Sequence, residues 1–202
     1  MYMSNFVSVQ SKRCFILCAQ TFGNSLPLSF SFSGLQDFGS IVSNINWFWR
    51  QCHKAMRLSF TSILLWKTSP FADISKLENI IKNFAAKQEP LPMSFSSIGS
   101  LPNENNVLFL APTPTLSLLQ FHLQLCDAMK KEGIEVGDEH RPDTWIPLCP
   151  VAEEVPKTRM PEAFTVLRDL KLPISGYAMD IGLVEYPPVR EVFSFVMGNT
   201  AE

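Results

Sequence analysis

The side chains that could transfer protons or bind metal ions are few and widely spaced in this sequence. The histidines are His53, His122 and His140, and the five cysteines stand at positions 14, 18, 52, 126 and 149 without a Cys-x-x-Cys pair. Zinc sites and disulfide frameworks depend on regularly spaced ligands. We therefore expect no metal, no cofactor and a reducing compartment. This makes the chain intracellular and cytoplasmic, with organellar targeting left open as an alternative.

None of the three histidines heads a His-x-Ser/Thr triplet. His53 has no orienting partner beside it in the sequence. At 100° per residue, His122 falls within the apolar arc of a helix, which favours a buried structural histidine over a catalytic one. His140 belongs to a stretch typical of a solvated loop, in which its charged neighbours are Asp138, Glu139, Arg141 and Asp143.

The stretch 143–152, DTWIPLCPVA, is predicted to be a short apolar strand. Leu148 cannot carry a proton, and Pro147 and Pro150 offer neither a hydroxyl nor a backbone N–H group. Cys149 is the one thiol of the stretch. Taken alone, these residues favour an ordinary buried strand over a catalytic one.

Composition indicates a globular chain. Its 202 residues, 46% of them hydrophobic and 18% charged, suffice for one sizeable core or two small lobes that share one. The net charge of -2 gives no overall basic field, so nucleic-acid binding would need a local patch. No apolar run reaches the roughly 18 residues that a membrane span needs, and we expect no membrane partner.

Residues 1–66 differ from the rest of the chain. They hold five basic residues against the single acid Asp37, whereas the remainder is acidic. Their Ser-rich, acid-poor character is compatible with a transit sequence, although no Arg-rich amphipathic helix is evident. We interpret residues 1–66 as an atypical, poorly ordered segment and residues 67–202 as the folded domain.

Clear helix and strand signals begin after Thr68. Ser75 to Glu78 (SKLE) predicts a capping box that opens a helix ended by Pro90. A second helix is predicted from Thr115 to Lys131, and a third begins between Pro156 and Pro161. Strands are predicted at LPMSFSSIG (91–99), NNVLFLAP (105–112), LPISGYAMDIGLVEY (172–186) and VREVFSFVMG (189–198).

Two carboxylates of the long C-terminal strand could be read as an acid–base pair. Asp180 and Glu185 are five residues apart, however, and an odd separation places them on opposite faces of a regular strand. We expect each carboxylate to be solvated or paired with a lysine or arginine.

An internal repeat organises the folded part. A strand, a helix and a hairpin occur across residues 61–111 and again across 145–197, and LPMS at 91 and LPIS at 172 mark equivalent strand starts. Each copy offers a sheet with helices on one side. Two such copies facing each other leave a cleft between them.

Over residues 67–202 the sequence resembles the two-histidine phosphoesterases, which include 2′-5′ RNA ligases and cyclic phosphodiesterases, and is most similar to plant RNA ligase/cyclic nucleotide phosphodiesterase family members. The stretches that carry the resemblance are SPFADISKLENIIKNFA, LPMSFSSIGSLPNENNVLFLAPTPTLSLLQ, DTWIPLCPVAEEVP and SGYAMDIGLVEYPPVREVFSFVMG. The resemblance implies an α+β fold with two lobes of duplicated antiparallel sheets and flanking helices around a central cleft.

The family's two catalytic motifs, each His-x-Thr/Ser, are absent here. By this resemblance the second histidine and hydroxyl positions hold Leu148 and Pro150, and the first pair falls near Ile63 and Leu65. The strand that normally opens the fold has no clear counterpart in residues 1–66. The first lobe is therefore expected to be incomplete.

Three functions remain open. The favoured one is a non-catalytic member whose cleft binds a nucleotide or RNA end. The second is an active cyclic phosphodiesterase that uses His53, His140 or Cys149, and the third is an interaction protein that associates through an unpaired sheet edge. The oligomeric state is left open. The substrate-cleft candidates are Ser94, Ser96, Ser175, Tyr177 and Cys149.

Overall fold

The computed structural model describes most of the chain from Lys12 onward. The described residues are 12–21, 61–68, 73–101, 106–152, 155–170, 172–186 and 190–198. For residues 12–21 and 61–68, and for Tyr186 and Arg190, only the backbone is described. Three predictions lie outside this part of the chain. They are the role of His53, the turn at Pro187 and Pro188, and the poor order of most of residues 1–66.

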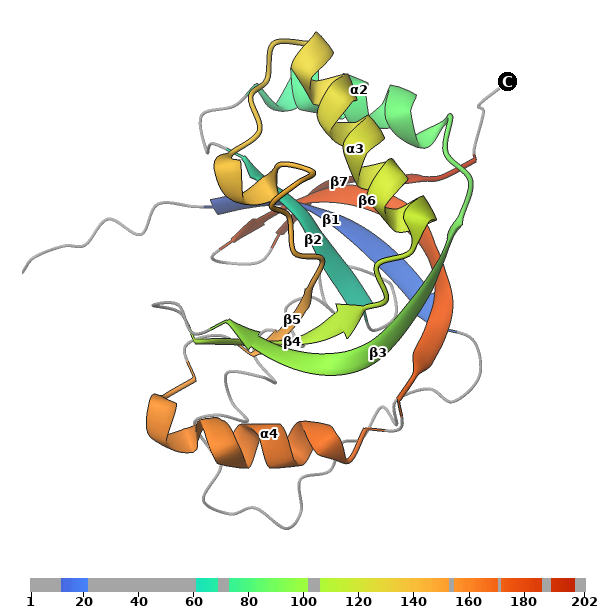
Figure 1. Ribbon diagram of the computed structural model, residues 1–202. Helices are drawn as coiled ribbons and strands as arrows, with labels where there is room; N and C mark the ends of the chain where they lie inside the picture. The colour runs from blue at the N-terminus through green and yellow to red at the C-terminus, as the bar shows by residue number, and fades with distance from the viewer. Residues whose placement is uncertain are drawn as a thin grey trace, which may run out of the picture.

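Strands and helices alternate along the described chain (Figure 1). The strands are β1 (Lys12–Thr21), β2 (Thr61–Thr68), β3 (Leu91–Leu101), β4 (Val107–Pro112), β5 (Cys149–Ala152), β6 (Ile174–Tyr186) and β7 (Arg190–Val196). The α-helices are α2 (Ile74–Ala85), α3 (Leu116–Lys131) and α4 (Met160–Arg168), and two short 3₁₀ helices are η1 (Asp138–His140) and η2 (Lys157–Arg159). The predicted α+β class is confirmed.

The strands join into one antiparallel sheet in the order β2-β1-β6-β3-β4-β5, and β7 pairs with β6 beside this path. The order is symmetric about its centre. The first lobe contributes β2, β1 and β6, the second contributes β3, β4 and β5, and the two lobes meet where β6 pairs with β3. Figure 1 shows that β3 and β6 bend strongly and that α2 and α3 lie together at one end of the sheet, with α4 at the other. The sheet curls so far that its two edge strands, β2 and β5, come into contact.

The internal repeat is visible at the centre of this sheet. Ser94 of β3 lies directly opposite Ser175 of β6, and these are the equivalent serines of LPMS and LPIS. Because each repeat pairs with the other through the same residue, the two copies are related by an approximate two-fold axis at this point. The predicted duplication therefore has a direct structural counterpart.

One face of the sheet and one side of each helix form the core. Strand residues alternate in and out of it, because successive side chains of a strand point to opposite faces. Leu91, Met93 and Phe95 of β3 are buried, whereas Pro92 is exposed and Ser94 half-buried. The helix α2 buries the apolar positions that its sequence predicted, which are Leu77, Ile80, Ile81, Phe84 and Ala85.

The start of α2 differs from the prediction. Asp73 is the N-cap, and its Oδ1 accepts hydrogen bonds from the backbone N–H groups of Ser75 at 2.9 Å and Lys76 at 3.3 Å. The predicted capping box at Ser75 is therefore wrong, because an aspartate two residues earlier already satisfies the free N–H groups. The N-cap of α3, Thr115, was placed correctly.

The predicted strand at 143–152 is shorter than expected. Only Cys149–Ala152 form β5. The preceding residues turn back on themselves, because the backbone N–H groups of Thr144 and Trp145 both donate to the carbonyl oxygen of Arg141. Pro147 cannot donate to a ladder, and the strand begins only after it, on the edge of the sheet where Pro150 is tolerated.

The strand β1 corrects the expectation that the opening strand is missing. It pairs with β2 on one side and with β6 on the other, so it completes the first lobe. Its position mirrors that of β4 in the second lobe, between the central strand and the edge strand.

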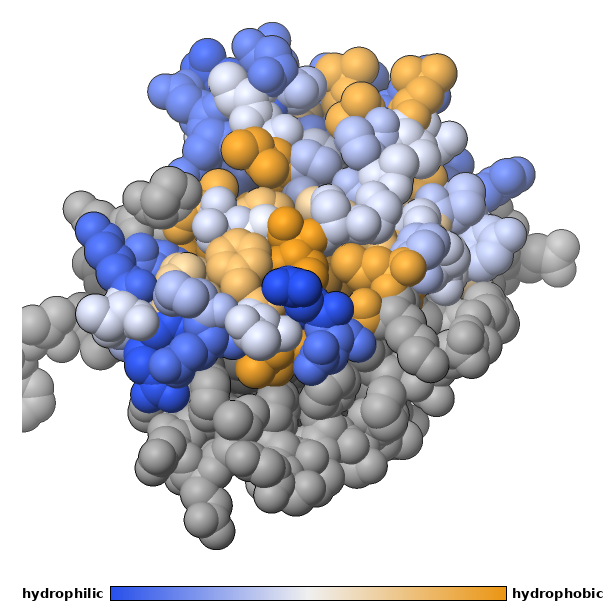
Figure 2. Space-filling view, turned by 60° about the horizontal axis from the view of Figure 1, so that its bottom comes forward, coloured by the Kyte–Doolittle hydropathy of each residue, from blue (hydrophilic) through white to orange (hydrophobic). Residues whose placement is uncertain are grey.

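The surface of the described residues is mixed in character. Figure 2 shows hydrophobic side chains gathered near the middle of one face, with hydrophilic groups on both sides of them. Among the described residues, no helix has the length and hydrophobicity to cross a membrane.

Candidate functional site

The face of the sheet opposite the core, here called the second face, carries the polar candidates. Ser94 lies between the core residues Met93 and Phe95, so it points to the second face. Ser175 is opposite Ser94, and Tyr177 is opposite Pro92, one residue from the buried Ala178. Three of the five predicted cleft residues therefore share one face at the centre of the sheet.

Hydroxyl groups interact with one another at this point. The Ser175 hydroxyl donates to Ser94 Oγ at 3.3 Å. Ser96 lies where the β3–β4 register shifts, and its Oγ is 3.1 Å from Thr113 Oγ1. Tyr177 is 46% exposed, so its ring offers a surface on which a base could stack. No local sequence signal marks Thr113, because the register shift that brings it to Ser96 depends on the pairing of β3 with β4.

The second face becomes apolar towards β5. Cys149 and Val151 belong to the core cluster, so Pro150 points away from the core, and it pairs with Phe109 of β4. Leu148 directly precedes the strand and is buried outside the core cluster. The side chains at these two positions therefore offer neither a proton carrier nor a hydrogen-bond donor.

Phe109 occupies this part of the face because a glycine makes room for it. Gly99 is opposite Phe109, and a Cβ atom at position 99 would lie 2.4 Å from Phe109 Cζ. A glycine inside a strand often marks such a close approach, which is the signal that could have identified this contact from the sequence.

The edge strands of the sheet, β2 and β5, contain Ile63, Leu65 and Pro150, and Leu148 directly precedes β5. Ile63 of β2 pairs with Leu17 of β1, and Leu65 is the extra residue where the β1–β2 register shifts. Since β2 contacts β5 across the curled sheet, the backbone at Ile63 and Leu65 belongs to the strand that meets the Leu148–Pro150 region.

Two other reactive side chains lie away from the second face. Cys149 is 2% exposed within the core, which separates it from the serines. His122 is 1% exposed, and its ring stacks on Trp145 at 3.8 Å between centroids, so its predicted burial is confirmed. The neighbouring Cys126 Sγ is 3.8 Å from His122 Nε2, and burial, followed by the charge of Asp127, raises the thiol pKa to about 11.

His140 corrects the prediction of a solvated histidine. It is 7% exposed, and its Nε2 lies 3.1 Å from Glu139 Oε1. Its carbonyl oxygen is 3.9 Å from Cys126 Sγ, which ties η1 to α3. The η1 segment also contacts β2, so this histidine lies nearer to an edge strand than its sequence suggested.

Asp180 is a second correction. It was expected to be solvated or paired with a cation, yet it is 4% exposed. Among the described ion pairs none involves Asp180, and burial raises its pKa. Burial and the charge of Asp180 together raise the pKa of Glu191 on β7. No group of three or more histidine, cysteine, aspartate or glutamate side chains suited to a metal ion occurs among the described residues.

Comparisons with known proteins give one family match and several similar solved structures. The sequence pattern of a family described as the 2′-5′ RNA ligase superfamily matches residues 61–189. A crystal structure of a phosphoesterase is similar to this chain with a TM-score of 0.48 and 10% identity, over 94% of this chain and 99% of the other. The structure of Escherichia coli LigT complexed with 3′-AMP is similar with a TM-score of 0.47 and 10% sequence identity, over 94% of this chain and 99% of LigT. The structure of LigT complexed with NADP+ has a TM-score of 0.48 and 9% sequence identity, over 94% of this chain and 99% of LigT. No curated protein sequence matches the chain.

The contact between Gly99 and Phe109 predicts a steric penalty. We expect Gly99→Ala to lower the free energy of unfolding by about 1–3 kcal/mol, as overpacking does. Gly137→Ala is the control, because nothing lies within 4 Å of a Cβ atom at position 137. Urea denaturation of both variants measures the difference, and equal stabilities would contradict the close packing of this part of the second face.

The burial of Asp180 predicts a pH-dependent stability. Its folded pKa lies above the ordinary value of 3.8, so ionisation costs the folded state free energy as pH rises through this interval, and the cost persists at neutral pH. Asp180→Asn should therefore raise the free energy of unfolding at pH 7, by an amount that shrinks towards pH 3.8. Glu78→Gln, at an exposed position of α2, is the control. A variant less stable than the wild type at pH 7 would show that the carboxylate is stabilising.

Proposed function

This chain belongs to the 2′-5′ RNA ligase superfamily, and on that premise we propose that it is a catalytically inactive member that binds a nucleotide or an RNA end on the second face. The observation that carries the proposal is the pair Leu148 and Pro150 at the β5 edge. These positions correspond to the histidine and the hydroxyl of the second family motif. Neither side chain can accept or donate a proton.

The loss of acid–base groups has a large expected effect. General acid and base groups each contribute about 10²- to 10⁴-fold to a rate. The side chains of Ile63 and Leu65 are equally unable to transfer a proton. If these positions correspond to the first family motif, both the general acid and the general base are missing. A chain of this kind retains the backbone framework of the site without its proton carriers.

The binding part of the proposal is supported by the centre of the sheet. The Ser94 hydroxyl accepts from Ser175, so its own proton can be donated to a phosphate oxygen, and one hydroxyl of the Ser96–Thr113 pair can donate in the same way. Tyr177 adds an exposed aromatic ring on the same face. Neutral donors and a stacking ring suit a single nucleotide better than a long polyanion.

An active phosphoesterase is the second candidate, and one observation favours it. His140 lies on η1 beside the edge strand β2, and Glu139 lies within 3.1 Å of its ring. A carboxylate next to a histidine is the arrangement that orients a general base. The alternative role of Cys149 loses its support, because this thiol is buried in the core.

The third candidate, an interaction protein, depends on an unpaired sheet edge in the first lobe. An unpaired edge in the first lobe was expected to recruit a partner strand. Here β1 lies between β2 and β6, so the strand whose absence would leave that edge is present, and β2 is the edge strand of the first lobe.

Titration with 2′,3′-cyclic AMP, with turnover followed in parallel, tests the proposal. We expect binding, with hydrolysis below about 1% of that of an active relative. Tyr177→Ala should weaken binding about tenfold, since stacking is worth about 1–3 kcal/mol per base. Ser94→Ala/Ser175→Ala should weaken it by a few-fold, and Ser117→Ala, at an exposed serine of α3, should leave it unchanged.

The same experiment separates the two candidates. Turnover comparable to that of an active relative, lost in His140→Ala and retained in His122→Gln, would establish the second candidate and overturn the first. Absence of any nucleotide binding would also refute the proposed function.

A further inference from the structure

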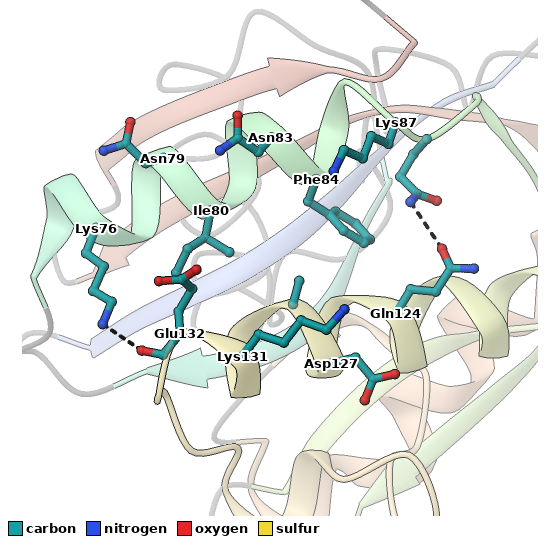
Figure 3. Close-up of a pocket in the computed structure, with 12 residues that line it drawn as sticks. Lys76, Asn79, Ile80, Asn83, Phe84, Lys87, Gln124, Asp127, Lys131 and Glu132 are labelled. Atoms are coloured by element: carbon teal, nitrogen blue, oxygen red, sulfur yellow. Dashed lines mark hydrogen bonds between the residues drawn. The ribbon is translucent and has the colours of Figure 1, made fainter.

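A groove of about 580 Å³ lies between α2 and α3, away from the second face (Figure 3). Its walls are the outward sides of the two helices. Phe84 of α2 meets Phe121 of α3 edge to face, with 5.1 Å between ring centroids, and this contact holds the helices together beneath the groove. The groove is therefore a fixed feature of the helix pair.

Hydrogen bonds tie the two helices near both ends of the groove. Lys76 Nζ donates to the carbonyl oxygen of Glu132 at 2.6 Å, at the C-terminal end of α3. Gln88 Nε2 donates to Gln124 Oε1 at 3.1 Å on the other side. These two contacts set the width of the groove, and they leave the space between them open (Figure 3).

Two lysines project into this open part from opposite walls. Figure 3 shows Lys87, just beyond α2, and Lys131, near the end of α3, with their ammonium groups on either side of Phe84. No described carboxylate forms an ion pair with either lysine.

The carboxylates that line the groove lie elsewhere in it. Asp127 is directed away from the two ammonium groups, and Glu132 lies at the Lys76 end beside Ile80 (Figure 3). The groove lining contains three lysines and two acids on a chain whose net charge is -2. The groove lining therefore carries a small excess of positive charge, although the whole chain is slightly negative.

We propose that this groove binds phosphate groups of single-stranded RNA, with Lys87 and Lys131 as the two cationic contacts. Lys76 is engaged by the α3 carbonyl, so it positions the helices and leaves the other two lysines for the anion. The amides of Asn83 and Gln124 add neutral donors along the wall. The choice of RNA rests on the proposed function, whereas the anion site rests on the groove itself.

The test uses a fluorescent oligouridylate of about eight nucleotides, a length within the usual range of single-strand sites. Affinity is measured by anisotropy between about 50 and 200 mM salt. For single strands each phosphate contact contributes about 0.7 to the slope of log affinity against log salt, so Lys87→Gln/Lys131→Gln should weaken binding and flatten the slope by about 1.4. Lys82→Gln/Lys130→Gln removes the same charge from the same two helices outside the groove and should leave the slope unchanged.

Lysine acetylation read by mass spectrometry supplies a local readout. Oligouridylate should protect Lys87 and Lys131 and leave Lys82 and Lys130 reactive, and this protection should persist in Tyr177→Ala even if nucleotide binding on the second face is lost. Equal slope changes in the two double variants would overturn the inference. So would protection by inorganic pyrophosphate without protection by RNA, which would identify a site for free phosphates.

Discussion

The pairing of β3 with β6 is the constraint on which the rest of this structure depends. Ser94 and Ser175, equivalent residues of the two repeats, lie opposite each other at the point where the lobes meet. This register fixes which residues of both strands enter the core, since a shift by one position would turn every side chain to the other face. It also places the two serine hydroxyls on the second face and brings β2 and β5 together as the two edges of a curled sheet.

Local patterns in the sequence predicted the elements well where packing follows the helix or strand period. The apolar positions of α2 and α3, the hairpin of β3 and β4, and the duplicated order of elements all agree with the structure, and the match over residues 61–189 confirms the family. The sequence failed where non-local contacts decide. The strand β1 is held by pairing with β6, far away in the chain, and a ten-residue run without clear alternation gives little sign of it. Burial of Asp180 and His140 likewise depends on neighbours from distant segments.

The candidate site shows the same division. Ser94, Ser175 and Tyr177 were foreseen together and do share a face, because strand alternation and the repeat specify it. Cys149 was placed among them, yet it alternates into the core. The apolar contact of Phe109 with Gly99 and Pro150 required the β4 register, which no local pattern supplies. What remains is a curled sheet with hydroxyl groups at its centre and apolar side chains at Leu148 and Pro150 beside one edge.

The central claim is that the framework is intact and only the proton carriers are missing. Installing both family motifs tests this most directly, through Ile63→His, Leu65→Thr, Leu148→His and Pro150→Thr in one chain, with hydrolysis of 2′,3′-cyclic AMP as the measurement. The account predicts a folded variant that hydrolyses the nucleotide at least about 10²-fold faster than the wild type, the lower bound for one acid–base group. A folded variant that binds the nucleotide and turns it over no faster than the wild type would contradict it.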